Sequence, residues 1–333
     1  MGFGSSERPR VPDFEVPDFE GRKLEGGIER RVELWEPSEV THVKLSIFRH
    51  GDKEKPKEGQ SADRVLLSEK GRAQATDASD PDRNVRQSLS FGSVKERSRQ
   101  TAAFRMAGHE SDITGDESLE ALETKFDTAL KEEGYGMGKK IGTDSRLDFE
   151  LDPSSEYGKA LYAAFSEGRY LRFLIDESDA LAKAVGDTEN STYSSQASGI
   201  ADLVLKYVNV SRNWDRIYRK DHTPEKENPK GYTETLERLL GTHQGIGESF
   251  LAEVIKRTEG EERRDTFVES LGNQGFGDVE GFELDISRRE GEDPEIRITF
   301  NKDYEKDGES KSFSFDREVP TDMIEEIAQM DRR

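Results

Sequence analysis

The feature that most constrains this chain is a short apolar stretch that ends in Arg49-His50-Gly51. Apolar residues recur at every second position over residues 42–48 (HVKLSIF), which predicts a β-strand. Open α/β sheets bind their ligands at the carboxyl ends of the strands. The glycine lets the backbone turn sharply there and come close to a ligand. An arginine and an imidazole at this edge suit an oxyanion, phosphate first among them.

Composition limits the partners that such a site can have. The chain has 333 residues, enough for one large domain or two modest ones, and 32% of them are hydrophobic against 36% charged. Its net charge of −21 disfavours generic binding to nucleic acid or to anionic membranes. The same field repels phosphorylated substrates. A phosphate site therefore needs its own local cluster of arginine and histidine.

The sequence lacks three features that bear on redox chemistry and cellular location: cysteines, a membrane-spanning apolar run and an apolar signal-peptide core. It contains no cysteine, which excludes disulfides, thiolate metal sites and cysteine nucleophiles. No apolar run approaches the roughly 18–20 residues that span a bilayer. The start, MGFGSSERPR, has no apolar core of a signal peptide. We therefore expect a cytoplasmic protein.

The composition also divides the chain into segments. VPDFE at residues 11–15 is repeated at once at 16–20, and prolines at this spacing block regular structure. We expect a flexible acidic tail rich in proline and glycine at 1–38 and a core domain at 39–259. Helical insertions occupy about 109–230 of that domain, and a β-hairpin and helix extension follows at 260–333.

Several helices are predicted in the core domain. Ser68 is the expected N-cap of one helix, and Ser93 with Glu96 forms a capping box for a second helix that ends at Gly108. The periodic pattern predicts further helices over Tyr157–Ile175, Gly199–Val208, Tyr232–Leu240 and Gly247–Lys256. The first two of these suggest a helical cap.

The final segment changes to a strand pattern. Alternating apolar residues at 282–286 and 296–300, with Gly291 and Pro294 between them, predict a β-hairpin. Phe313 and Phe315 suggest a third strand, and residues 323–327 a closing helix. The pattern leaves open whether these strands join the main sheet or form a small subdomain.

Two of the five histidines lie beside glycine between a predicted sheet edge and a helix. They are His50 and His243, the latter in the segment GTHQG. A histidine just before a helix N-terminus lies among free backbone N–H groups at the positive end of the helix dipole, which favours anions. Arg97 lies in the first turn of the capping-box helix, where its side chain can point toward the same edge.

Four motifs in a fixed order resemble a known family. FRHGD, LLSEKGRAQA, SVKERSRQTA and GTHQGI, spread over roughly residues 42–256, resemble the histidine phosphatase superfamily with its phosphoglycerate mutase-like fold. The resemblance implies an α/β fold of three layers with a mostly parallel central sheet and helical cap insertions. The strand pattern after residue 260 adds a C-terminal β-rich extension to this fold.

The resemblance also implies roles for individual residues. His50 would be the nucleophile that becomes a phosphohistidine, Arg49 and Arg97 would grip the phosphoryl oxygens, and His243 would donate a hydrogen bond to them. Guanidinium groups match oxyanion geometry, and two arginines with a histidine can supply the required charge. No metal and no cofactor is expected.

The proton donor is less sharply indicated. In the family a carboxylate follows a segment like Asp-x-Arg-Leu-x-Glu, and TDSRLDFE at 143–150 is out of register with it by one residue. Either Asp148 or Glu150 fits, with Glu150 slightly favoured. Lys53, which follows the Arg-His-Gly motif, is a further candidate for phosphate binding.

Three functions are compatible with these residues. The leading hypothesis is a metal-independent phosphomonoesterase that acts on a phosphorylated small molecule or phosphoprotein through a phosphohistidine. A phosphotransferase or mutase is the second, although the mutase run Leu-Asn-Glu-Arg-His-Tyr-Gly is missing. The third is a non-catalytic phospho-ligand-binding protein of the same fold. The sequence indicates neither the substrate nor the oligomeric state.

Overall fold

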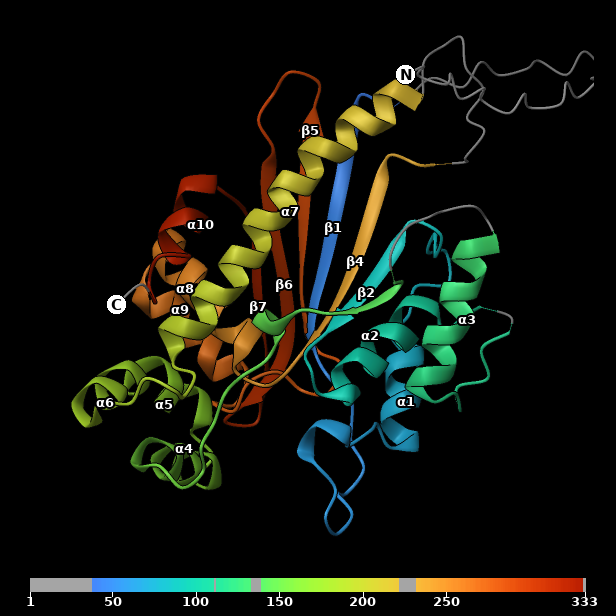
Figure 1. Cartoon of the computed structure of the whole chain (residues 1–333). Helices are drawn as coiled ribbons and strands as arrows, with labels where there is room; N and C mark the ends of the chain where they lie inside the picture. Colours follow the sequence, from blue (N-terminus) through green and yellow to red (C-terminus); the bar gives the residue numbers. More distant parts are fainter. Residues whose placement is uncertain (1–37, 111, 133–138, 222–231, 332–333) are drawn as a thin grey trace, which may run out of the picture. The chain divides into compact units, whose positions relative to one another are not determined.

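A seven-stranded mixed sheet forms the centre of the protein (Figure 1). The structure, a computed structural model, describes residues 38–110, 112–132, 139–221 and 232–331, so the predicted tail lies outside the described residues except for Ser38. The strand order is β3-β2-β4-β1-β5-β6-β7. The strands are β1 (Val40–Arg49), β2 (Ser88–Gly92), β3 (Ile141–Thr143), β4 (Thr235–Thr242), β5 (Gly281–Arg289), β6 (Glu295–Lys306) and β7 (Glu309–Val319).

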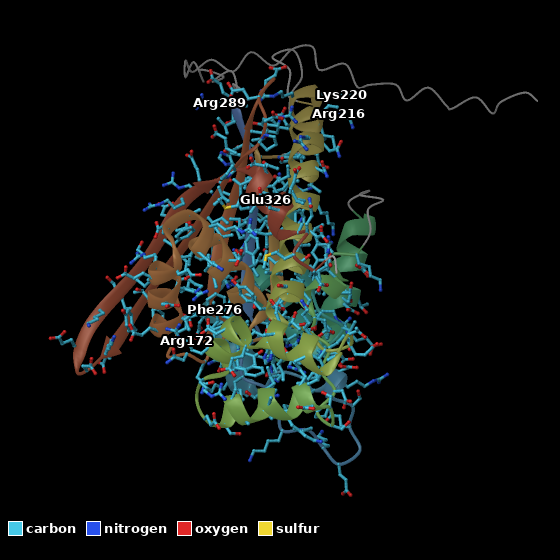
Figure 2. All side chains as sticks on the ribbon, turned by 90° about the vertical axis from the view of Figure 1, so that its left-hand side faces the viewer. Arg172, Arg216, Lys220, Phe276, Arg289 and Glu326 are labelled. Carbon is cyan, nitrogen blue, oxygen red and sulfur yellow. The ribbon has the colours of Figure 1, made fainter. Side chains whose placement is uncertain are left out.

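Strand direction divides the sheet into two halves. β3, β2, β4 and β1 run parallel, whereas β5, β6 and β7 continue the sheet in antiparallel pairs. The extension therefore joins the main sheet, which was one of the two possibilities that the sequence left open. Figure 2 shows the two ends of this sheet: Phe276, just before β5, lies toward one end, and Arg289 at the end of β5 lies toward the other. Arg289 pairs with Val40, so the carboxyl end of β1 is at the Phe276 end.

Helices cover both faces of the sheet, which confirms the three-layer α/β fold (Figure 1). One face carries α1 (Glu69–Asp77), α2 (Glu96–Ala107) and α3 (Leu119–Glu132). The other carries α7 (Tyr193–Asp221), α8 (Ile246–Glu259), α9 (Glu261–Ser270) and α10 (Thr321–Ile327). The remaining helices of the insertion are the short α4 (Glu156–Ser166), α5 (Tyr170–Asp176) and α6 (Ser178–Val185), with the single turn η2 (Ser145–Leu147). Another single turn, η1 (Ala62–Arg64), lies between β1 and α1.

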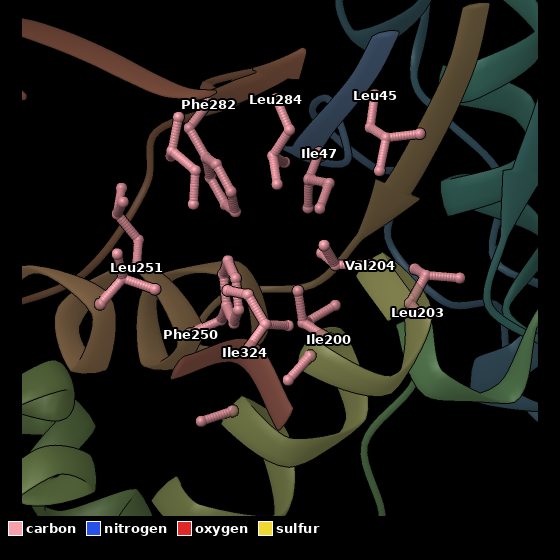
Figure 3. Close-up of a cluster of buried hydrophobic side chains, with 14 of the residues drawn as sticks. Leu45, Ile47, Ile200, Leu203, Val204, Phe250, Leu251, Phe282, Leu284 and Ile324 are labelled. Atoms are coloured by element: carbon pink, nitrogen blue, oxygen red, sulfur yellow. The ribbon is translucent and has the colours of Figure 1, made fainter. Parts of the chain in front are cut away.

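The main hydrophobic core lies between the sheet and the α7, α8 and α10 layer (Figure 3). Ile47 of β1 and Phe282 of β5 face Phe250 of α8 and Val204 of α7, and each of these side chains is at most 2% exposed. Phe250 and Phe282 stack with ring centroids 6.0 Å apart. Each large apolar side chain buried in this way contributes about 1.5–3 kcal/mol. The core thus fixes β1 firmly in the middle of the sheet.

Strand β4 corrects the prediction of a helix over Tyr232–Leu240. The segment is instead a central parallel strand between β2 and β1. Leu239 and Leu240 pack into the clusters on opposite faces of the sheet, as residues of a strand buried on both sides do. The charged Glu237 and Arg238 obscure this pattern in the sequence. Glu237 is accommodated by an ion pair with Arg83 at 2.9 Å.

Two other predicted helices are confirmed with different limits. Gly247–Lys256 lies within α8, and Gly199–Val208 within the much longer α7. The predicted helix over Tyr157–Ile175 is divided into α4 and α5. The division lies at Gly168, whose φ of 77° is outside the helical region.

Helix α1 meets the loop after β1 through a glycine. Ser68 caps the helix as predicted, accepting a hydrogen bond from the Gly71 N–H at 3.1 Å. A Cβ atom on Gly71 would lie 1.9 Å from the Asp52 carbonyl oxygen, so no side chain fits there without movement of the backbone. This close approach explains the glycine in the motif LLSEKGRAQA.

Replacing this glycine is the first test of the fold. We expect Gly71→Ala to lower the free energy of unfolding by about 2 kcal/mol, because the clash outweighs the gain in helix propensity of about 1 kcal/mol. Ala73→Ser, at an exposed position of the same helix, is the control and should change stability little. Urea denaturation measures both. A more stable Gly71→Ala protein would contradict the packing described here.

Candidate active site

The two histidines singled out by the sequence lie side by side. His50 and His243 directly follow the neighbouring parallel strands β1 and β4, and the His50 N–H donates to the Thr242 carbonyl at 3.0 Å. Their ring centroids are 5.1 Å apart with an interplanar angle of 68°. Both residues are buried, with exposed fractions of 6% and 2%. The pairing of two strands that are distant in sequence therefore creates a paired-histidine site.

Hydrogen bonds define the tautomer of His50. Its Nδ1 lies 2.7 Å from the Gly51 carbonyl oxygen, and a carbonyl can only accept, so Nδ1 carries the proton. Nε2 then has a free electron pair, toward which the Arg97 Nε–H donates at 3.1 Å. Burial lowers the pKa of His50 to about 3; the Gly51 bond opposes this change, and the charges of Arg97, Arg49 and Lys53 add to it. The imidazole is thus neutral near pH 7 and presents Nε2 as a potential nucleophile.

His243 is held through a serine. Its Nε2 lies 2.7 Å from the Ser93 hydroxyl oxygen, while its buried Nδ1 has no hydrogen-bond partner among the described residues. Burial, followed by the charges of His50 and Arg97, keeps the pKa of His243 well below its usual value. When Ser93 donates to Nε2, the single proton of the neutral ring sits on Nδ1, ready to be donated to a ligand.

This role of Ser93 corrects the predicted capping box. Helix α2 begins at Glu96 after an N-cap at Lys95, and no side chain caps it. The Ser93 hydroxyl accepts from the Lys95 N–H at 3.0 Å and contacts His243. The Ser93 hydroxyl therefore makes these two contacts and does not cap α2.

The two predicted arginines are held by different partners. Arg97, which is 6% exposed, also donates through Nη1 to the Ala62 carbonyl at 2.9 Å. Arg49 donates through Nη1 to the Phe276 carbonyl at 2.7 Å, and its Nη2 lies 3.7 Å from Asp278. The buried Nε of Arg49 has no hydrogen-bond partner in the described parts of the chain. A buried donor without a partner costs about 1–3 kcal/mol, a cost that a bound oxyanion would remove.

Lys53 adds a third positive charge. Partial burial lowers its pKa, and the nearby charges of Arg97 and Arg49 lower it further. Within the described residues, no side-chain hydrogen bond or ion pair of Lys53 is formed. The local cluster of cations that a phosphate site needs in this acidic chain is therefore present.

The structure distinguishes the two candidate carboxylates. The Asp148 side chain is 8% exposed, forms an ion pair with Lys95 and places Oδ1 3.7 Å from His243 Nε2. Glu150 is exposed, and its contact with Ser191 is made by its backbone N–H at 2.9 Å. The structure therefore places Asp148 beside the histidines and not Glu150, the carboxylate that the sequence slightly favours.

Two further motif residues hold the backbone of the Arg-His-Gly loop. The Thr101 hydroxyl accepts from the Gly51 N–H at 3.2 Å, and the Gln74 side-chain oxygen accepts from the Asp52 N–H at 3.0 Å. Thr101 also donates to the Arg97 carbonyl at 2.8 Å, so it links the two halves of the site. Sequence analysis assigned no role to either residue, although both lie within the quoted motifs.

Another buried group was also missed. Glu248, in the first turn of α8, is fully buried, and this raises its pKa to about 7. Its position three residues after Gly245 was a possible signal, because an acid at this place accepts from free N–H groups at a helix start. Its Oε2 accepts from the Gly245 N–H at 2.9 Å.

In residues 38–110, 112–132, 139–221 and 232–331, no group of three or more His, Cys, Asp or Glu residues could hold a metal ion. No helix in these ranges is long and apolar enough to cross a membrane.

Comparisons with known proteins find similarity among solved structures. No family model matches the chain, and no curated protein matches it. The native mycobacterial glucosyl-3-phosphoglycerate phosphatase Rv2419c is 16% identical, over 74% of this chain and 90% of that one, with a TM-score of 0.38. A putative phosphohistidine phosphatase SixA from Agrobacterium tumefaciens is 14% identical, over 77% and 97%, with a TM-score of 0.29. Phosphoglycerate mutase from Bacillus anthracis is 13% identical, over 89% and 99%, with a TM-score of 0.37.

These three structures are those of two phosphatases, one of them putative, and of a phosphoglycerate mutase. The likenesses are distant, with identities of 13–16% in these three structures. What this chain does is therefore inferred from its own site residues.

The buried His50 gives a prediction for the pH dependence of stability. Its pKa of about 3 lies below the value of 6.5 in the unfolded chain, so between these pH values the unfolded state binds more protons. Stability from this group is present above pH 6.5 and is lost as the pH falls toward 3. When the pH is lowered from 7.5 to 4.5, we expect the free energy of unfolding of wild type to fall by about 2–3 kcal/mol more than that of His50→Gln.

Urea denaturation at the two pH values measures this difference. His109→Gln removes an exposed histidine and serves as the matched control. Equal losses for wild type and His50→Gln would show that His50 is not held neutral by burial.

Proposed function

We propose that the protein is a metal-independent phosphomonoesterase that works through a phosphohistidine on His50. The observation that supports this most is the arrangement of unused groups around His50 Nε2. The Nε2 electron pair faces Arg97, while the Arg49 Nε–H and the Nδ1 of His243 are buried without partners in the described structure. The oxygens of a tetrahedral dianion at this place would accept from the Arg49 Nε–H and from a protonated His243 Nδ1, while its phosphorus would face the Nε2 electron pair.

The first step transfers the phosphoryl group to the protein. The Nε2 electron pair of His50 attacks phosphorus, and the bond from phosphorus to the ester oxygen breaks. Arg49, Arg97 and Lys53 stabilise the charge on the phosphoryl oxygens, and His243 donates to them from Nδ1. Asp148, in its protonated form, gives its proton to the leaving oxygen.

The second step releases phosphate. The Asp148 carboxylate accepts a proton from water, whose oxygen attacks phosphorus as the bond to Nε2 breaks. The electron pair returns to His50, inorganic phosphate leaves, and Asp148 is again protonated for the next ester. Asp148 is assigned this role because it, and not Glu150, lies within 3.7 Å of His243.

A phospho-ligand-binding protein without turnover is the second candidate. The ion pair between Lys95 and Asp148 favours it, because a carboxylate paired with an ammonium group must give up that partner before it can carry a proton. Phosphoryl transfer to a second substrate instead of water would indicate the third possibility, a phosphotransferase or mutase.

The reaction is tested by hydrolysis of an aryl phosphate, followed by a screen of phosphorylated metabolites, nucleotides and phosphopeptides. We expect His50→Ala to abolish turnover, together with the acid-labile phosphoprotein that wild type forms from labelled substrate. Asp148→Asn should lower kcat by about 100-fold or more, as expected for loss of a general acid and base. Glu150→Gln is the matched control and should leave kcat unchanged.

The outcomes separate the candidates. Full activity of His50→Ala would exclude the phosphohistidine mechanism. Phosphate binding without turnover at any pH would identify a binding protein. A loss of activity in Glu150→Gln, with Asp148→Asn unaffected, would reverse the assignment of the carboxylates.

A further inference from the structure

A short segment between α9 and β5 lies against the site. This segment, residues 273–278 (NQGFGD), is called here the 273–278 strap. Its first residue, Asn273, accepts from the Leu171 N–H at 2.8 Å through its carbonyl. The next carbonyl, that of Gln274, accepts from the side chain of Gln244, which directly follows His243. Phe276 is 1% exposed and anchors the strap in the main hydrophobic core.

Glu248 connects this strap to the turn that follows His243. Its Oε1 accepts from the Phe276 N–H at 2.7 Å, while Oε2 accepts from the Gly245 N–H at 2.9 Å. The side chain is fully buried. A Cβ atom on Gly275 would lie 2.6 Å from Oε1, so the strap approaches the carboxylate as closely as a glycine allows. One carboxylate thus fixes two backbone segments relative to each other.

The same strap holds Arg49 on its other side. The Phe276 carbonyl accepts from Arg49 Nη1 at 2.7 Å, and Asp278 lies 3.7 Å from Nη2. Gln74 donates to Asp278 at 3.3 Å, so that carboxylate is itself held in place. Nη1 is hydrogen-bonded to the strap and Nη2 is within ion-pair distance of it, whereas the buried Nε has no hydrogen-bond partner in the described structure.

These contacts form a chain from Glu248 through Phe276 to Arg49. We propose that Glu248 is a positioning residue, whose carboxylate holds the 273–278 strap so that the Nε–H of Arg49 is directed at the bound phosphoryl group. This inference rests on the proposed function. It assigns the C-terminal part of the chain a role in phosphate binding, through backbone groups that carry no sequence motif.

The chemistry of the contacts requires a carboxylate at this position. Both oxygens accept from N–H groups, and glutamine would turn its own NH₂ toward one of them. A buried N–H group facing another donor is left unsatisfied, which shifts the strap or the turn. Aspartate keeps the charge but is one methylene shorter, so it cannot reach both N–H groups. Glu248→Gln and Glu248→Asp are therefore expected to act alike.

The test is a double-mutant cycle on the affinity for inorganic phosphate, measured by titration calorimetry on the full chain. We expect Glu248→Gln and Glu248→Asp each to weaken phosphate binding about tenfold, the effect of impairing one charge-assisted hydrogen bond. In an Arg49→Ala background the same substitutions should change the affinity less than about twofold, because the positioned group is gone. A purely structural role of Glu248 would weaken binding equally in both backgrounds.

Glu253→Gln is the matched control. Glu253 is another buried glutamate of α8, bound to the Tyr193 hydroxyl at 2.9 Å and to Arg257 at 2.7 Å, with no contact to the strap. We expect its substitution to leave phosphate affinity unchanged. Weakening by Glu253→Gln as large as that by Glu248→Gln would overturn the inference.

The cycle also separates this inference from the proposed function. If wild type binds phosphate but hydrolyses no ester, the phosphatase proposal fails and the cycle still decides the role of Glu248. If wild type hydrolyses esters and the cycle shows no coupling, only the positioning role fails. If wild type neither binds phosphate nor hydrolyses an ester, both proposals fail.

Discussion

The parallel pairing of β1 with β4 is the constraint on which the site depends. The register places Arg49 opposite Thr242, so the two residues that follow, His50 and His243, leave the sheet next to each other. The bond from the His50 N–H to the Thr242 carbonyl extends this pairing one residue beyond the strands. The main core packs on both strands. A shift in register would therefore both expose buried apolar area and move the two imidazoles apart. The same strand pairing therefore determines both the stability of the sheet and the geometry of the site.

Burial gives this geometry its chemistry. The pKa values of both histidines are lowered chiefly by desolvation, so the rings are neutral and one of them presents a free electron pair. The cations around them would normally attract water or acidic side chains, yet Arg49 Nε has no hydrogen-bond partner in the described residues. Two nearby acids of this chain, whose net charge is −21, are occupied by other partners. Asp148 pairs with Lys95, and Glu248 accepts from backbone N–H groups.

Features with a local signal can be predicted from the sequence, whereas features that depend on partners in distant segments cannot. His50, Arg49, Arg97 and His243 could be found because each lies in a short motif at an element end. Strand β4 was mistaken for a helix because charged residues interrupt its apolar run, and their partners, such as Arg83, come from elsewhere. The choice between Asp148 and Glu150 depends on which one faces Lys95 and His243, and a one-residue shift against the motif cannot decide that. The 273–278 strap acts through backbone carbonyl and N–H groups, which any sequence possesses.

The C-terminal strands contribute to the site because β5 pairs directly with β1. β5 lies on the flank of β1 opposite β4, and it approaches so closely that a Cβ atom on Gly281 would lie 1.9 Å from the Ile47 carbonyl oxygen. The Arg49 N–H donates to the Glu280 carbonyl at 2.9 Å, one residue before β5 begins. The backbone of Arg49 is thus fixed by β5 and its side chain by the strap that leads into β5, whereas His50 is fixed from the β4 side. His50 and Arg49 are adjacent in sequence but held by different parts of the chain, so loosening the extension should disturb Arg49 before it disturbs His50.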